Sequence, residues 1–157
     1  MSLWQRFLAY GLLGWCAEIV WTALYDTIAG TGRPPGDAVG RVPLTRAERL
    51  RLSGRTYLWM LPLYGSAALL FEPAHDALAS SAWPLRGLAY TVGIFAVEAL
   101  SGGLLRLITG RCPWDYSYAR LSALGGTIRL DYGPVWFVFG LMLERAHDLF
   151  RGIQLPP

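Results

Sequence analysis

The longest hydrophobic stretch of the chain runs from Gly87 to Leu105 and contains a single charged residue, Glu98. At about 1.5 Å per residue, a helix of this length crosses the hydrocarbon core of a bilayer, which is about 30 Å thick. A surface helix of a soluble protein would have a polar face, which this stretch lacks. The pattern therefore predicts a transmembrane helix with one carboxylate at mid-depth. Because a charge is costly in lipid, that carboxylate should face a bundle interior, a cavity or a partner.

Three further segments have a similar character, although each is shorter or more interrupted. With the third span at Gly87 to Thr109, the spans are Phe7 to Ile28 with Glu18 near its centre, Tyr57 to Phe71 with a kink expected at Pro62, and Leu130 to Phe150. The sequence therefore predicts an all-α integral membrane protein with four transmembrane helices, forming a single membrane domain over residues 1–157.

The segments between the spans are polar or rich in Gly and Pro, which break helices. The connector at residues 29–56 is the longest of them. Within it, Thr45 to Leu52 is typical of a short amphipathic helix at a membrane surface, with Thr45 and Glu48 as a capping box, and a solvated turn is the alternative. Glu72 to Pro84 is predicted to be a polar link, and Gly110 to Arg129 a loop.

Arginine positions predict the orientation of the spans. Ten of the 14 arginines lie in or beside the connectors that follow the first and third spans. Positively charged loops remain on the cytoplasmic side of a membrane. We therefore expect both long connectors to be cytoplasmic and both termini outside, in a plasma membrane or a bacterial inner membrane.

Composition agrees with this class and excludes others. Hydrophobic residues make up 54% of the chain and charged residues 16%, and seven Trp and eight Tyr suit two membrane interfaces. There is no Lys, which excludes a nucleotide-binding P-loop, and the net charge of +3 comes without the basic block of a nucleic-acid-binding protein. Cys16 and Cys112 are expected to be free thiols. The expected partners are the bilayer and a membrane protein or a second copy of the chain, with no cofactor.

The chain contains an internal repeat. The sequence FEPAHD at Phe71 to Asp76 returns as LERAHD at Leu143 to Asp148, each time after a hydrophobic span. A tyrosine precedes each central glutamate by eight residues in the first and third spans. This agreement predicts two helical hairpins, residues 1–80 and 81–157. Because each contains an even number of spans, the hairpins should run parallel, related by an axis along the membrane normal.

Glu18 and Glu98 should therefore share one depth in the bundle. One interpretation is a carboxylate pair that binds a cation, a proton or a polar ligand, because two acids in a low dielectric repel each other unless one is neutralised. The alternative is that each acid accepts a hydrogen bond from a Tyr, Trp or Ser of a neighbouring helix.

A metal site is a further possibility raised by the acidic and histidine residues. Four-helix bundles can hold two metal ions with one Glu on each of two helices and a Glu-x-x-His pair on each of the others. The residues that fit this pattern are Glu18, Glu98, Glu72, His75, Glu144 and His147. Two points oppose it: Pro73 disturbs helical spacing after Glu72, and the Glu144 pair should lie nearer the outer surface than Glu18. Polar residues that end two spans at the interface are the alternative.

The most distinctive short sequence is Trp114-Asp115-Tyr116-Ser117. Trp and Tyr suit the headgroup level, and Asp and Ser can cap a turn. We expect either a structural turn that holds the loop on the bundle or part of a binding site, with Trp114, Asp115 and Tyr116 as ligand candidates beside the two buried acids. Both His are predicted outside and Cys112 inside, so no nucleophile–His arrangement and no catalytic residue is indicated.

These motifs resemble a known family. The run Cys112 to Ser117, followed by GTIRLDY at Gly126 to Tyr132, together with GWCAE at Gly14 to Glu18 and Tyr90 before Glu98, is similar to the transmembrane protein 229 family and to the bacterial group labelled ABC-transporter type IV. The resemblance covers nearly the whole chain. It implies a multi-pass membrane protein with four spans, and it supplies no substrate or catalytic residue. In that family an acid is typical at the Glu72 and Glu144 positions, whereas the two His are not.

The functional expectation is a non-enzymatic membrane component, either permease-like or a partner subunit, whose buried carboxylates bind a cation, a proton or a polar ligand. The first alternative is a structural or interaction protein, in which small residues such as Gly102 and Gly103 let helices approach closely. The second is a membrane enzyme that uses the carboxylates and histidines to hold a metal.

Overall fold

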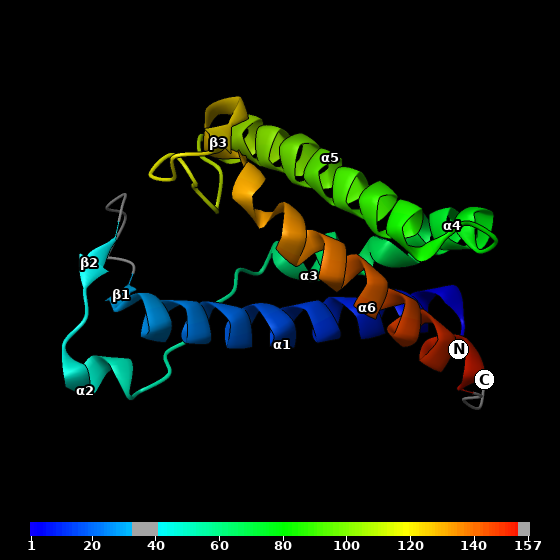
Figure 1. Ribbon diagram of the computed structural model, residues 1–157, viewed down its shortest axis with the longest axis horizontal. Helices are drawn as coiled ribbons and strands as arrows, with labels where there is room; N and C mark the ends of the chain where they lie inside the picture. The colour runs from blue at the N-terminus through cyan, green and yellow to red at the C-terminus, as the bar shows by residue number, and fades with distance from the viewer. Residues whose placement is uncertain (33–40, 154–157) are drawn as a thin grey trace.

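The computed structural model describes residues 1–32 and 41–153 and is mostly helical (Figure 1). The helices are α1 (Leu3–Ala29), α2 (Arg46–Arg49), α3 (Met60–Gly65), α4 (Ala67–Leu78), α5 (Trp83–Thr109) and α6 (Gly133–Gly152), with short 3-10 turns η1 (Leu124–Gly126) and η2 (Leu130–Tyr132). The strands are two-residue antiparallel pairs: β1 (Thr31–Gly32) with β2 (Val42–Pro43), and β3 (Ser122–Ala123) with β4 (Ile128–Arg129).

The helices form two hairpins. Helix α1 packs along α3 and α4, and α5 packs along α6. Figure 1 shows α1 and α5 running in the same direction, with α6 crossing between them. The connector strands and the β3–β4 loop lie at one end of the molecule, and both ends of the described chain lie at the other. There the N-terminal ammonium of Met1 donates a hydrogen bond to the Ile153 carbonyl at 2.8 Å.

The long helices of the two hairpins are equivalent in length and ending. Helix α1 and helix α5 each contain 27 residues, and each ends at a glycine in the left-handed conformation, Gly30 and Gly110. Glycine adopts that conformation without strain, so both helices stop at a residue suited to ending them. Their starts differ, because α1 begins with a capping box at Ser2 and Gln5, whereas α5 has Pro84 in its first turn.

Two helices of the part of the chain described here, α1 and α5, are long and apolar enough to cross a membrane. Only 22% of the most apolar stretch of each is buried inside the molecule. Large side chains such as Leu12, Val20, Leu100 and Leu107 are exposed along them, whereas Asp26, Glu72 and His147 are buried. A soluble protein rarely exposes so much continuous apolar surface.

The second hairpin helix differs from the sequence-based expectation of a single span over 57–71. It is divided into α3 and α4 at Ser66, not kinked at Pro62. Pro62 is the third residue of α3, in the first turn, where its missing N–H has no helical partner to lose. The predicted polar link from Glu72 is wrong as well, because α4 continues through Pro73 to Leu78.

Other boundaries changed as well. The segment predicted as a short amphipathic helix over 45–52 is the single turn α2, for which the expected capping box is present: the Thr45 hydroxyl accepts from the Glu48 N–H, and the Glu48 side chain accepts from the Thr45 N–H. The fourth helix begins at Gly133 instead of Leu130, because the preceding three residues form the 3-10 turn η2.

Candidate functional site

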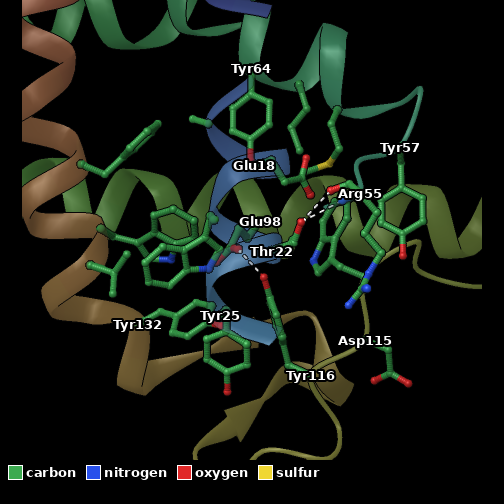
Figure 2. A pocket seen from close by; sticks show the side chains of 18 of the residues that line it. Glu18, Thr22, Tyr25, Arg55, Tyr57, Tyr64, Glu98, Asp115, Tyr116 and Tyr132 are labelled. Atoms are coloured by element: carbon green, nitrogen blue, oxygen red, sulfur yellow. Dashed lines mark hydrogen bonds between the residues drawn. The ribbon is translucent and has the colours of Figure 1, made fainter. Parts of the chain in front are cut away.

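A cavity of about 290 Å³ lies between the two hairpins, toward the connector end (Figure 2). We call it the aromatic cavity, because tyrosine, tryptophan and phenylalanine side chains make up much of its wall. Its aromatic lining residues are Trp21, Tyr25, Tyr57, Tyr64, Trp114, Tyr116, Tyr118, Tyr132, Trp136 and Phe139. The five residues named from the sequence as ligand candidates, Glu18, Glu98, Trp114, Asp115 and Tyr116, all line this cavity.

Two half-buried glutamates enter the aromatic cavity from equivalent helices. Glu18 comes from α1 and accepts a hydrogen bond from the Thr56 hydroxyl. Glu98 comes from α5, and the Tyr116 hydroxyl donates to its Oε1 at 3.4 Å. Figure 2 shows the Tyr64 hydroxyl beside Glu18, and Tyr64 interacts electrostatically with both carboxylates.

Glu98 has an incomplete set of partners. The Trp136 indole lies beside its carboxylate. Nevertheless, the buried Oε2 atom of Glu98 and the indole N–H each lack a hydrogen bond of normal geometry to any residue that the structure describes. No cationic side chain within the described ranges forms an ion pair with Glu98. Buried carboxylate oxygens are normally satisfied, so this oxygen has capacity for a further hydrogen-bond partner.

The Trp114-Asp115-Tyr116-Ser117 segment forms the expected turn, and its first three residues also line the aromatic cavity. The Trp114 indole donates to the Thr127 carbonyl at 3.0 Å, and Asp115 Oδ1 accepts from the Ser117 N–H at 2.8 Å, which together fix a turn. Gly126 is required beside this turn, because it has φ of +86° and a Cβ there would lie 2.7 Å from Asp115. The turn directs Tyr116 inward to Glu98, whereas Asp115 lies at the rim of the cavity (Figure 2).

The mouth of the aromatic cavity contains charged residues that sequence reasoning did not identify. Asp26, 5% exposed, accepts hydrogen bonds from Arg41 and from Arg55, the latter at 2.9 Å. The Arg41 guanidinium also lies 4.8 Å from the centre of the Tyr25 ring. Asp26 occurs near the end of its helix, where a charge is unremarkable, and its arginines are distant in sequence. Only the folded connector brings them together.

Arg129 contacts two tyrosines that line the cavity, Tyr25 and Tyr132. Its guanidinium lies 4.4 Å from the centre of the Tyr132 ring and donates to Asp131 Oδ2 at 2.7 Å. The hydrogen bonds from Arg129 hold the pKa of Asp131 below its ordinary value of 3.8, and Asp131 raises the pKa of Arg129. Arg41 and Arg129 thus both stack on rings of tyrosines that line the cavity, an arrangement stabilised by cation–π attraction.

The repeated Glu-x-x-His sequences form a second site at the opposite end. We call Glu72, His75, Glu144 and His147 the His–Glu cluster. Within each hairpin an arginine bonds the glutamate: Arg6 to Glu72 at 2.8 Å and Arg86 to Glu144 at 2.7 Å. Between hairpins each histidine faces the glutamate of the other, His147 to Glu72 at 3.8 Å and His75 to Glu144 at 3.7 Å. The two rings are 4.7 Å apart.

The six residues considered for a metal do not form one group. Tyr90 of α5 donates to Glu144 at 2.9 Å. Glu98 follows Tyr90 by eight residues on α5, so it lies about 12 Å further along that helix. The ligand atoms that do gather are those of His75, His147 and Asp148, all within 4.8 Å of one another. Pro73 does not disturb the helical spacing after Glu72, because α4 continues through it. However, Glu72 and Glu144 are already bonded to arginines.

Comparison with known proteins adds no assignment. No family model matches the chain, and no solved structure matches it. The resemblance to the transmembrane protein 229 family therefore remains a prediction from the motifs.

Proposed function

We propose that this chain is a four-span membrane protein that binds a small cationic or polar ligand in the aromatic cavity, as a permease-like protein or the binding subunit of a larger assembly. The observation that carries the proposal is the cavity between the hairpins, into which two equivalent helices each contribute one glutamate, Glu18 and Glu98. The exposed apolar surfaces of α1 and α5 support the membrane location. No catalytic step is assigned to the site.

The four-span arrangement is supported by the path of the chain, because each hairpin returns it to the end from which it started. Helices α3 and α4 together return the chain to the end where α1 begins, and α6 does the same for α5 (Figure 1). The break at Ser66 is tolerable in lipid because neighbouring groups satisfy the freed carbonyls: the Ser66 N–H bonds the Pro62 carbonyl and its hydroxyl bonds the Leu63 carbonyl.

The test is ligand-induced stabilisation of the purified protein in lipid nanodiscs. The melting temperatures of the wild type and of Glu98→Gln are measured with Na⁺, K⁺, Ca²⁺ or tetramethylammonium. Binding to the folded state alone raises the melting temperature in proportion to the logarithm of ligand concentration. We expect at least one of these cations to stabilise the wild type and to lose its effect on Glu98→Gln.

Glu48→Gln is the matched control, because Glu48 lies outside the cavity in the exposed turn α2 and retains a hydrogen-bonding side chain after substitution. It should respond to the cation as the wild type does. Failure of every cation to stabilise the wild type, or an unchanged response of Glu98→Gln, would rule out a cation-binding carboxylate site.

A further inference from the structure

A second cavity adjoins the aromatic cavity and has a different character. It has a volume of about 190 Å³ and lies further toward the His–Glu cluster. We call it the apolar cavity, because Glu98 is the one charged residue among those lining it. Its wall comes from both hairpins and includes Leu70, Phe71, Gly93, Ile94 and Leu143.

The two cavities meet at Glu98. Six residues line both of them: Met60, Leu63, Tyr64, Glu98, Trp136 and Phe139. The space between the hairpins therefore changes at Glu98 from a wall with several charged residues to one with no other charged residue. A ligand that fills both parts would place a polar group at Glu98 and a hydrocarbon group beyond it.

The charge of that polar group follows from what is already paired. The two arginines lining the aromatic cavity, Arg41 and Arg55, are both bonded to Asp26, so they offer little to an anion. Glu98 has an unsatisfied Oε2 atom and no ion pair within the described residues. The nearby rings of Tyr64, Tyr116 and Trp136 add π-faces, which together with a carboxylate attract an ammonium group desolvated from water.

We propose that the ligand is an amphiphilic organic cation, an ammonium group carrying a short hydrocarbon chain. The ammonium group sits between Glu98 and the rings of the aromatic cavity, and the chain fills the apolar cavity. This inference rests on the proposed cation-binding function and narrows it to one class. It excludes inorganic cations as the preferred ligand, because they would leave the apolar cavity empty.

The experiment compares three ligands of one series in nanodiscs: tetramethylammonium, butyltrimethylammonium and hexyltrimethylammonium. Binding is measured by calorimetry and by the fluorescence of the tryptophans that line the site. Each buried methylene contributes about 0.8 kcal/mol when fully removed from water. We expect hexyltrimethylammonium to bind at least tenfold more tightly than tetramethylammonium, and hexanesulfonate and 1-hexanol not to compete with it.

Gly93→Leu separates the chain from the head group. Gly93 lines the apolar cavity and has nothing within 4 Å of a Cβ placed there, so the backbone accommodates a larger side chain beside the cavity. Leucine also favours a helix over glycine. The variant should bind hexyltrimethylammonium at least tenfold more weakly than the wild type and bind tetramethylammonium unchanged, whereas Glu98→Gln should weaken both.

The outcomes distinguish this inference from the function on which it rests. If tetramethylammonium or an inorganic cation binds and chain length brings no gain, the cation site stands and the amphiphilic ligand is wrong. The same conclusion follows if Gly93→Leu leaves the affinity for hexyltrimethylammonium intact. If no cation of either series binds the wild type, both proposals fall.

Discussion

At the scale of single residues, glycine sets how closely the helices of each hairpin approach. A Cβ on Gly14 of α1 would lie 2.4 Å from Cβ of Tyr64, and one on Gly140 of α6 would lie 2.5 Å from Cβ of Tyr90. In each hairpin a glycine of one helix thus receives a tyrosine of the other. These tyrosines point to the two sites, since Tyr64 lines both cavities and Tyr90 contacts the His–Glu cluster.

Gly14→Ala should therefore destabilise the protein. The added methyl group overlaps the first carbons of Tyr64, so the helices must separate, and overpacking of this kind costs about 1–3 kcal/mol. We expect a melting temperature several degrees below that of the wild type in nanodiscs. Gly103→Ala is the control, because a Cβ at Gly103 meets nothing within 4 Å. Equal stability of the two variants would contradict this packing.

The Arg129–Asp131 pair predicts a pH dependence of the loop that precedes α6. The pKa of Asp131 is lower in the folded protein than its ordinary value of 3.8, because Arg129 donates hydrogen bonds to the ionised form. Such a group stabilises the fold above its unfolded pKa, and the contribution is lost as the pH falls through the lower, folded value. Proteolysis of the loop by pepsin should therefore accelerate as the pH falls below the pKa of Asp131 in the folded protein.

Asp131→Asn provides the comparison for this pH dependence. It should make the loop sensitive to protease at all pH values and remove the acid-dependent component of the cleavage rate. An unaltered pH profile in this variant would assign the acid sensitivity to other groups.

At the scale of elements, the hydrophobic pattern predicts the long helices α1 and α5 but not the end of α4. Helices α1 and α5 could be predicted from sequence because their apolar residues continue for about the width of a bilayer core. The end of α4 could not, because Glu72, His75 and Asp76 look like the start of a polar link. Their polarity is explained only by partners distant in sequence: Arg6, Glu144 and Arg151.

The local sequence pattern also decides which residues of the candidate site could be predicted. Glu18 and Glu98 are noticeable as isolated charges inside apolar runs, and the sequence placed them at equivalent positions. Asp26, Arg41 and Arg129 occur among other polar residues, where nothing in the local pattern distinguishes them. Their importance comes from tertiary contacts with Tyr25 and Tyr132, which no local pattern encodes.

Glu72→Gln tests whether the pairs between helices stabilise each hairpin. Glu72 has a side chain only 3% exposed and accepts two hydrogen bonds from Arg6, at 2.8 and 3.1 Å. Removing one partner leaves the other charge buried, which costs about 3 kcal/mol. We expect a large drop in the melting temperature.

Asp148→Asn is the control for Glu72→Gln. Asp148 lies at the same end of the molecule, but it is 60% exposed and 3.9 Å from Arg145, which is itself 88% exposed. An exposed pair of this kind contributes no more than about 1 kcal/mol. A Glu72→Gln variant as stable as Asp148→Asn would mean that the buried pair does not hold α1 to α4.

At the scale of the whole molecule, both ends of the described chain lie together and both long loops lie at the opposite end (Figure 1). The proposed four-span topology requires this arrangement. Its direction in the membrane rests on the arginines of the connectors, which favour the cytoplasmic side.

Reporter fusions should give this topology directly. A reporter at either terminus and one inserted in the link at residues 79–82 should be outside, and one inserted between β2 and α3 should be cytoplasmic. The readout is alkaline phosphatase and green fluorescent protein activity in cells. Opposite locations for the two termini would contradict an even number of spans.

The His–Glu cluster makes each half of the chain depend on the other. His75 faces Glu144 of the second hairpin, and His147 faces Glu72 of the first. Residues 1–80 and 81–157 made as two separate polypeptides should therefore complement each other when co-expressed, and each should be degraded when made alone. A single polypeptide supplies the two hairpins in equal amounts.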